Sequence, residues 1–470
     1  MKSILLYASF AALSASSVFA ACSPKADNKA DNTGGTSPGE TTAGGDGTGN
    51  TSGKKSTPGS AGDATSAGGA AGGGGQPASS MGGEGPSGSG TPITSCGTGV
   101  RLEGDPLWTD YLDGNKPAGQ GLFDDPPIRN EAIAVIGNML FVETEYEIWS
   151  ADLSAKTPKI SRFAGLETGN PGSIDAGLPC KDTRFLVMRD MVAKPNGKLA
   201  IVDYVGGAIL EISDPAGPNC KSDWVAGTHM KSDDPGNDYP LAQGDKDGPG
   251  ADALFGDVGG GGGLVHITTD PDGNLYTFDN GTGKFKMIAN ESDKARTVST
   301  IGQGSGDDNV LGLAFVKGKL YATGVDGSND FLIEIDPAKY DKAKPKASVH
   351  DVFRAPDHFA DVEAGHQAVI SEAISDGEAL IISGDSGFVW RVATDGTVLA
   401  TLAGTGVHTD YSPVGEDPFD PTKPHPASEW WLNYDVSNSN GGPWLALTDN
   451  KLYWSGGFGT GKHIVQFSCK

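Results

Sequence analysis

Positive charge is scarce in this 470-residue chain. Its 35 lysine and arginine residues are outnumbered by 60 aspartate and glutamate residues, which gives a formal net charge of −25. A protein that binds nucleic acid needs a basic surface to replace the counterions of the phosphates, so this balance excludes that class. An acidic body is also repelled by anionic lipid headgroups. The composition therefore leaves neutral or cationic partners.

The chain has one long apolar stretch, at its N-terminus. Residues 4–21 follow Lys2 and contain only small or apolar residues apart from Ser and Tyr, which is typical of a secretory signal. The stretch ends in Phe19-Ala20-Ala21-Cys22. This ending resembles the lipobox of bacterial lipoproteins, although that family usually has Leu where Phe19 stands. Ordinary signal cleavage, which would leave Cys22 as a free thiol, is the alternative.

The resemblance implies that residues 1–21 are a lipoprotein signal and that Cys22 carries the lipid. Two or more acyl chains anchor a protein stably, whereas one chain binds marginally. Ser23 follows the cysteine, and by resemblance a residue other than Asp there points to the outer membrane. We therefore expect a lipid-anchored protein of the bacterial cell envelope.

Aromatic residues are absent from the next segment, residues 23–94, which is rich in Gly, Ser and Thr. Its only large apolar side chains are Met81 and Ile93. A segment of this kind cannot bury enough apolar surface to offset the entropy of ordering. We expect 22–94 to be a disordered tether, with one folded domain over 95–470.

Cysteine is also rare: there are five, and none has the C-x-x-C spacing of zinc ribbons and thioredoxin-type sites. If Cys22 is acylated, four remain, and an even number fits disulfides in an oxidising compartment. Four cysteines allow three pairings. The fold described next favours Cys96–Cys469 and Cys180–Cys220.

From Cys96 onwards, one pattern recurs six times: a turn, a short apolar strand, a break of small residues and a second apolar strand. Further apolar runs lie before each copy and after each of the first five. The six copies are 138–152, 197–212, 273–288, 318–335, 378–392 and 450–467. Four short strands joined by tight turns predict antiparallel sheets.

Six such sheets predict an all-β fold, a six-bladed β-propeller, because each sheet can bury both faces only by stacking in a ring. A β-sandwich is the alternative, but it does not explain six copies of one hairpin. The last copy has material for only three strands, so a strand from 97–131 should complete it. This closure would place Cys96 beside Cys469.

The loops support this fold by resemblance. Val225-Ala226-Gly227, followed by 244–255 with Asp, Gly and Ala before Phe255, resembles the junction between NHL repeats. Phe163-Ala164-Gly165 and Leu402-Ala403-Gly404 are weaker copies, and Asp203 and Asp279 occupy matching places. The resemblance implies that Phe255 fills the wedge between two blades.

Two places could carry chemistry. A cluster of metal-capable side chains, Asp357, His358, Asp361, Glu363 and His366, precedes the fifth copy without a standard spacing. Inner strands should begin near Arg189-Asp190, His266, Gly312, Glu372 and 433–435, so that polar side chains converge on the axis. By contrast, Asp245 and Asp247 do not fit an EF-hand, and we expect a solvated acidic turn there.

Because no complete catalytic set is present, our first hypothesis is a non-enzymatic module that binds a protein or glycan as a monomer without a cofactor. Trp430 and Trp431 are candidate contacts, since paired aromatics stack on sugars or anchor interfaces, although packing between blades explains them equally. The alternative is a metal-dependent lyase or lactonase-like hydrolase with Ca²⁺ or Zn²⁺ in the channel.

Overall fold

The structure is a computed structural model. It describes residues 92–102, 132–165, 177–227, 244–256, 263–290, 296–355, 359, 370–406, 423–432 and 443–470, without 145, 157, 159, 186, 205, 307, 328, 385–386, 431, 449 and 459–460. Within these residues, no helix is both long enough and apolar enough to cross a membrane. The signal, Cys22, most of the predicted tether, the 357–366 cluster except Phe359, and Trp431 all lie outside the described residues.

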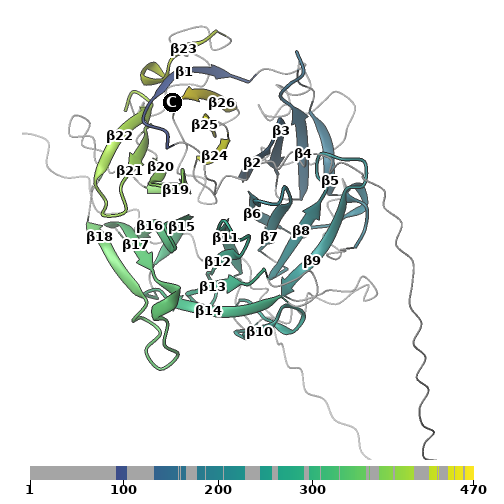
Figure 1. Cartoon of the computed structure of the whole chain (residues 1–470), viewed down its shortest axis with the longest axis vertical. Coiled ribbons are helices and arrows are strands. Elements are labelled where there is room, and N and C mark those ends of the chain that lie inside the picture. Colours follow the sequence, from purple (N-terminus) through teal and green to yellow (C-terminus); the bar gives the residue numbers. More distant parts are fainter. Residues whose placement is uncertain are drawn as a thin grey trace, which may run out of the picture. The chain divides into compact units, whose positions relative to one another are not determined.

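The described strands form six antiparallel sheets arranged as blades around an axis, which is a six-bladed β-propeller (Figure 1). Blades one and two contain β2 (Ala132–Ile136), β3 (Met139–Glu143), β4 (Glu147–Asp152) and β5 (Ser161–Gly165), then β6 (Met188–Ala193), β7 (Leu199–Asp203), β8 (Ala208–Ser213) and β9 (Lys221–Gly227). Blades three and four contain β11 (Leu264–Thr269), β12 (Leu275–Asp279), β13 (Lys284–Ile288) and β14 (Thr297–Gln303), then β15 (Asn309–Val316), β16 (Lys319–Asp326), β17 (Asn329–Ile335) and β18 (Val349–Ala355). Blade five contains β19 (Ile370–Ser375), β20 (Leu380–Gly384), β21 (Val389–Val392) and β22 (Val398–Ala403).

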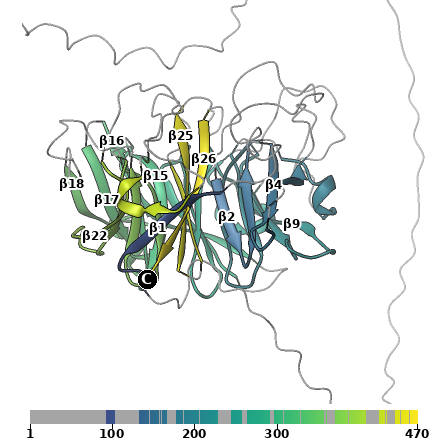
Figure 2. The ribbon, with the colours of Figure 1, turned by 90° about the horizontal axis from the view of Figure 1, so that it is seen from above.

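Blade six draws on both ends of the domain. It contains β24 (Trp444–Thr448), β25 (Lys451–Phe458) and β26 (Gly461–Cys469), and its outer strand is β1 (Cys96–Arg101). Figure 2 shows β1 running beside β26. The expected closure by an N-terminal strand is therefore confirmed.

The closure is reinforced by covalent and backbone bonds. Cys96 and Cys469 are direct partners across β1 and β26 and form a disulfide. Thr94 donates its backbone N–H to the carbonyl of Lys470 at 2.7 Å, and Ile93 is buried in the core between blades five and six. Ile93 and Thr94, which the sequence placed in the tether, thus belong to the ring.

Apolar side chains fill the spaces between neighbouring blades. Separate buried clusters join blades two and three, three and four, four and five, and five and six, and a larger one joins blades six, one and two. Phe255 lies in the cluster between blades two and three, as the NHL resemblance implied. Each blade thus buries its faces against its neighbours, which is the physical reason for the ring.

Three blade junctions share one structure. The outer strands β5 and β9 end in Ala-Gly, and β22 ends in Ala403 with Gly404 directly after it. Gly165, Gly227 and Gly404 all have positive φ values, between 93° and 99°. Each junction then has a Pro, a short 3-10 turn and, six residues after the Pro, a buried apolar side chain. The turns are η1 (Cys180–Asp182), η2 (Gly250–Asp252) and η4 (Ala427–Glu429), and the side chains are Phe185, Phe255 and Leu432.

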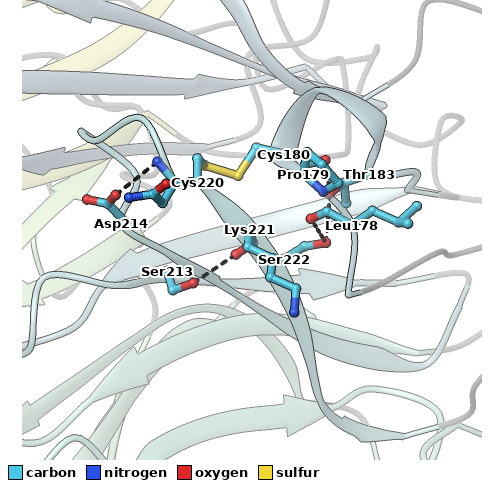
Figure 3. The surroundings of a disulfide bond; sticks show 10 residues. Leu178, Pro179, Cys180, Thr183, Ser213, Asp214, Cys220, Lys221 and Ser222 are labelled. Atoms are coloured by element: carbon cyan, nitrogen blue, oxygen red, sulfur yellow. Dashed lines mark hydrogen bonds between the residues drawn. A yellow bond between two sulfur atoms is a disulfide. The ribbon is translucent and has the colours of Figure 1, made fainter.

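These turns hold consecutive outer strands together. The turns η1, η2 and η4 contact β5, β9 and β22 respectively, on the preceding blade. The residues just before each turn pair with the outer strand of the following blade. Pro179 pairs with Lys221 of β9, β10 (Gly248–Pro249) pairs with β14, and β23 (His425–Pro426) pairs with β1. At the first junction the Cys180–Cys220 disulfide adds a covalent bond between η1 and the residue before β9 (Figure 3).

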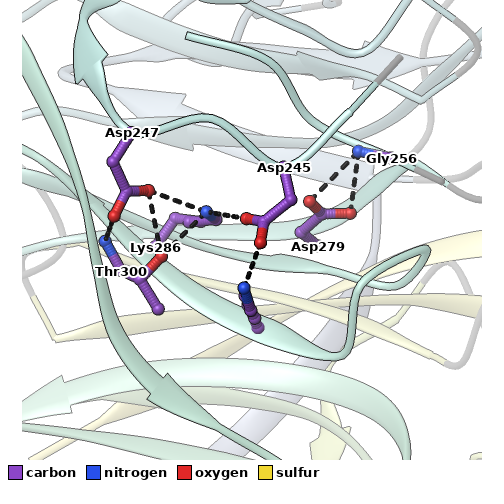
Figure 4. A network of polar contacts seen from close by, with 7 residues as sticks. Asp245, Asp247, Gly256, Asp279, Lys286 and Thr300 are labelled. Carbon is purple, nitrogen blue, oxygen red and sulfur yellow. Dashed lines mark hydrogen bonds and ion pairs between the residues drawn. The ribbon is translucent and has the colours of Figure 1, made fainter. Parts of the chain in front are cut away.

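The acidic turn before η2 is exposed, as expected, but its two carboxylates also bind a buried lysine. Lys286 on β13 is fully buried, and its Nζ donates to Asp245 at 2.7 Å and to Asp247 at 2.8 Å (Figure 4). Asp247 also accepts from the backbone N–H and the hydroxyl of Thr300, and Asp245 pairs with Lys284. The two carboxylates compensate a buried ammonium and fasten this loop to blade three.

Candidate axial binding site

Four inner strands carry a β-bulge at the same place. The hairpin register shifts directly after Met188, Leu264, Val310 and Ile370. Three of these residues are opposite the last residue of the second strand of their blade, and Val310 is opposite Gly324, two residues before the end of β16. The residues two positions further on are Asp190, His266, Gly312 and Glu372. A bulge redirects a side chain, so blades two to five deliver these four residues from equivalent positions around the axis.

Asp190 connects two blades at this level. Its Oδ1 accepts a hydrogen bond from the backbone N–H of Met191 at 2.7 Å, and its Oδ2 accepts one from the N–H of Ile267 in blade three at 2.8 Å. Nδ1 of His266 lies 3.7 Å from the same Oδ2, which is ion-pair distance but too long for a hydrogen bond. Asp190 is therefore anchored by backbone donors.

Glu372 and His266 keep buried atoms without partners. Glu372 is 6% exposed and His266 is 8% exposed, and among the described residues neither Oε2 of Glu372 nor Nδ1 of His266 has a hydrogen-bond partner. The ring of His266 lies against that of Trp444 in blade six, with centroids 5.8 Å apart. Nε1 of Trp444 also has no such partner. Buried polar atoms of this kind cost free energy unless something satisfies them.

Asp190, Glu372 and Trp444 line a small cavity on the axis. The cavity has a volume of about 40 Å³ and is lined by residues of all six inner strands, β2, β6, β11, β15, β19 and β24. Figure 1 shows these strands around the axis. Asp190 and Glu372 are the charged side chains in its described lining; the rest of the lining is apolar apart from Thr268. The volume holds a few water molecules or one small polar group.

Burial sets the protonation behaviour of the two carboxyl groups. Loss of solvent raises the pKa of Glu372 well above its usual range, and the nearby charge of Asp190 raises it further. Burial also raises the pKa of Asp190, although His266 and the two backbone donors act in the opposite direction. Such a carboxyl pair resists double ionisation, which is a common property of functional sites.

Gly312 is the member of the ring that contributes no side chain. A Cβ there would lie 2.5 Å from the backbone nitrogen of Ala373 and 2.8 Å from the carbonyl oxygen of Ser371 in blade five. Blades four and five therefore approach each other too closely for any larger residue. The missing side chain leaves three ionisable groups, from blades two, three and five, at this level.

The structure brings only some of the predicted site residues together. Asp190, His266 and Glu372 are brought together, and the half-buried Arg189 lies next in sequence and stacks on the Tyr204 ring at 5.0 Å. The inner strand of blade six begins at Trp444 rather than near 433–435. Trp444 was missed, because an apolar strand with one aromatic residue does not distinguish a channel residue from a core residue.

Trp430 does not offer an exposed contact, which corrects that candidate. It is 3% exposed and packs edge-on against Phe467 in the core between blades five and six. Trp430 therefore packs between blades, which is the alternative explanation for this residue. Its neighbour Trp431 lies outside the described residues.

A metal site is not formed by the described side chains. Among them, no three His, Cys, Asp or Glu residues are grouped closely enough to hold a metal ion. His358, Asp361, Glu363 and His366 lie outside the described residues. The alternative of a metal-dependent lyase or hydrolase therefore stays a prediction.

Comparisons with known proteins find a distant likeness to solved structures. No family model and no curated protein matches the chain. A virginiamycin B lyase from Staphylococcus aureus has 10% identity over 72% of this chain and 94% of its own, with a TM-score of 0.39. An auxiliary nutrient binding protein from Bacteroides thetaiotaomicron has 11% identity over 79% and 76%, with a TM-score of 0.44. A regucalcin from Agrobacterium tumefaciens has 12% identity over 75% and 95%, with a TM-score of 0.40.

Proposed function

We propose that this protein is a binding module of the bacterial cell envelope whose ligand contacts the axial site. The observation that carries the proposal is a set of buried atoms without partners among the described residues. Glu372 and Trp444 line one cavity from different blades, and Nδ1 of His266 lies beside Asp190, which belongs to the same lining. A satisfied structural core would leave no such set. A ligand that supplies the missing partners gains free energy from them.

Two further features support a location in the cell envelope. The domain contains two disulfides, Cys96–Cys469 and Cys180–Cys220, which indicates folding outside the cytosol. The N-terminal sequence, with its lipobox-like ending at Cys22, provides the anchor in this proposal, and the segment over 22–94 provides the spacer. The substitution Cys22→Ala should release the protein from the membrane fraction; unchanged partition would refute the lipid anchor.

The binding role can be tested without knowing the ligand. Tyr204 directly follows β7, at the end of blade two where the inner-strand bulge places Asp190. We would replace Tyr204 in the full-length protein by benzoyl-phenylalanine, which is also aromatic, and irradiate living cells. The matched control carries the same group at Val398, an exposed residue on the outer edge of blade five.

Covalent adducts at position 204 that are missing at position 398 would support a ligand at the axial end of the ring. Adducts at both positions or at neither would contradict the proposed binding role.

A further inference from the structure

The unpartnered atoms of the axial site specify part of the ligand. Oε2 of Glu372 offers an acceptor lone pair in either protonation state, and Nδ1 of His266 is an acceptor when the ring proton is on Nε2. Asp190 adds a second carboxyl group, with Oδ2 3.7 Å from His266. Two carboxyl groups in the lining of one cavity, with His266 beside Asp190, favour a donor group with positive charge.

The size of the cavity limits that group. About 40 Å³ admits a single ammonium group and excludes a sugar ring or a planar guanidinium with its five donors. The surrounding apolar lining suits a hydrocarbon stem. A primary ammonium on an unbranched chain satisfies both requirements.

The spacing of the acceptors favours an ammonium over a metal ion. The described side chains do not form a group that could hold a metal, whose oxygen and nitrogen ligands must lie at about 2.0–2.6 Å. An ammonium accepts longer contacts of about 2.7–3.2 Å between nitrogen and oxygen, so it tolerates a wider ring of acceptors.

Lysine side chains and free amino sugars both carry primary ammonium groups. In lysine the nitrogen ends a flexible four-carbon stem, whereas in an amino sugar it is attached to a ring that the cavity cannot admit. A polypeptide also supplies carbonyl acceptors for the indole N–H of Trp444, which has no partner among the described residues. The net charge of −25 attracts basic proteins over long range.

We infer that the axial site binds a lysine side chain of a basic partner protein, with the ammonium group accepted by Glu372 and Asp190. This inference rests on the proposed binding role and adds the chemical class of the ligand. Arg189, half-buried and next to Asp190, is not part of the ammonium contact.

The test is calorimetric titration of the full-length protein with a blocked tripeptide that has lysine between two glycines. Parallel titrations use the same peptide with acetylated lysine or with arginine, and free glucosamine. Each is repeated with Glu372→Gln, which keeps the side-chain shape, and with Glu334→Gln. Glu334 accepts from Lys319 and Tyr321 within blade four, outside the axial lining, and is the matched control.

We expect the lysine peptide to bind and Glu334→Gln to leave its binding unchanged. A bound ammonium favours the ionised form of Glu372, and Gln cannot supply that negative charge, so Glu372→Gln should weaken binding about tenfold or more. Acetylation should abolish binding and arginine should weaken it. Equal binding of the acetylated peptide, preference for glucosamine, insensitivity to Glu372→Gln, or no binding by any probe would each overturn the inference. In those cases photo-adducts at position 204 would still support the binding role. Failure of the lysine inference can therefore be told apart from failure of the binding role.

Discussion

The carboxylate of Asp190 in blade two accepts the backbone N–H of Ile267 in blade three, at 2.8 Å. Ile267 directly follows His266, so the bond fixes two of the three ionisable residues of the axial site relative to each other. At the equivalent position in blade four, the Cα of Gly312 faces the backbone nitrogen of Ala373, which directly follows Glu372. The bulges therefore serve both the packing of neighbouring blades and the placement of the site.

The first prediction concerns this inter-blade bond. The substitution Asp190→Asn replaces one acceptor oxygen by a donor, so one of the two buried N–H groups, of Met191 or Ile267, loses its partner. We expect the free energy of unfolding to fall by about 1–3 kcal/mol, measured by urea denaturation. Asp223→Asn is the control, because Asp223 is exposed on β9, and it should change stability by less than about 0.5 kcal/mol. Equal effects of the two substitutions would refute the anchoring role.

The second prediction is a pH dependence. An unfolded chain loses the Glu372 proton near its ordinary pKa of 4.5, whereas the folded protein keeps it to a pKa well above that. The folded state thus binds more protons above pH 4.5, and this group makes the protein less stable as the pH rises through the folded pKa. Glu372→Gln removes the titration.

Thermal unfolding should therefore show little difference between Glu372→Gln and the wild type at pH 4, and a higher melting temperature for the variant at pH 8. A difference that is the same at both pH values would contradict a buried carboxyl with a raised pKa.

The third prediction ranks the two disulfides. The Cys96–Cys469 bond closes a loop of 373 residues and the Cys180–Cys220 bond one of 40. In the chain-entropy model these contribute on the order of 5–6 and 4 kcal/mol as upper figures. Replacing both cysteines of the first pair by alanine should lower the melting temperature more than replacing both of the second. The opposite ranking would mean that the Cys96–Cys469 disulfide adds little to ring closure.

The fourth prediction concerns the Ala-Gly ends of the outer strands. Gly227 has a φ of 96°, and a Cβ there would lie 2.2 Å from the carbonyl oxygen of Gly207. Gly197 also has a positive φ, 76°, but a Cβ there meets nothing within 4 Å. Gly227→Ala should destabilise the domain by more than about 2 kcal/mol, and Gly197→Ala by about 1 kcal/mol. Similar losses would show that backbone conformation alone, without close approach, selects glycine at 227.

The fold could be predicted from the sequence because its signal is local and repeated. Each hairpin carries its own turn residues and alternating apolar residues, so six copies were visible, and the three-stranded last copy required closure by an N-terminal strand. The junction turns were seen only at Gly227–Phe255. The copies that contain Pro179 and Pro426 share only Pro, an acidic residue and a large apolar residue, which is too little to recognise without the structure.

The site could be predicted only in part. Asp190, His266 and Glu372 were noticed as polar residues near the starts of inner strands, but their equivalence depends on β-bulges that the residue pattern does not show. Burial of Trp430 and the pairing of Asp245 with Lys286 depend on contacts between distant segments. Local sequence does not encode such contacts, so it left the role of Trp430 open and did not show that the exposed acidic turn binds a buried lysine.

The most direct test of the axial site is a crystal structure of the full-length protein with the lysine tripeptide bound. The account predicts the peptide ammonium about 3 Å from Oε2 of Glu372, inside the cavity between the inner strands. A peptide bound elsewhere, for example along the exposed Val398 and Leu399 of β22, with the axial cavity unchanged, would contradict it.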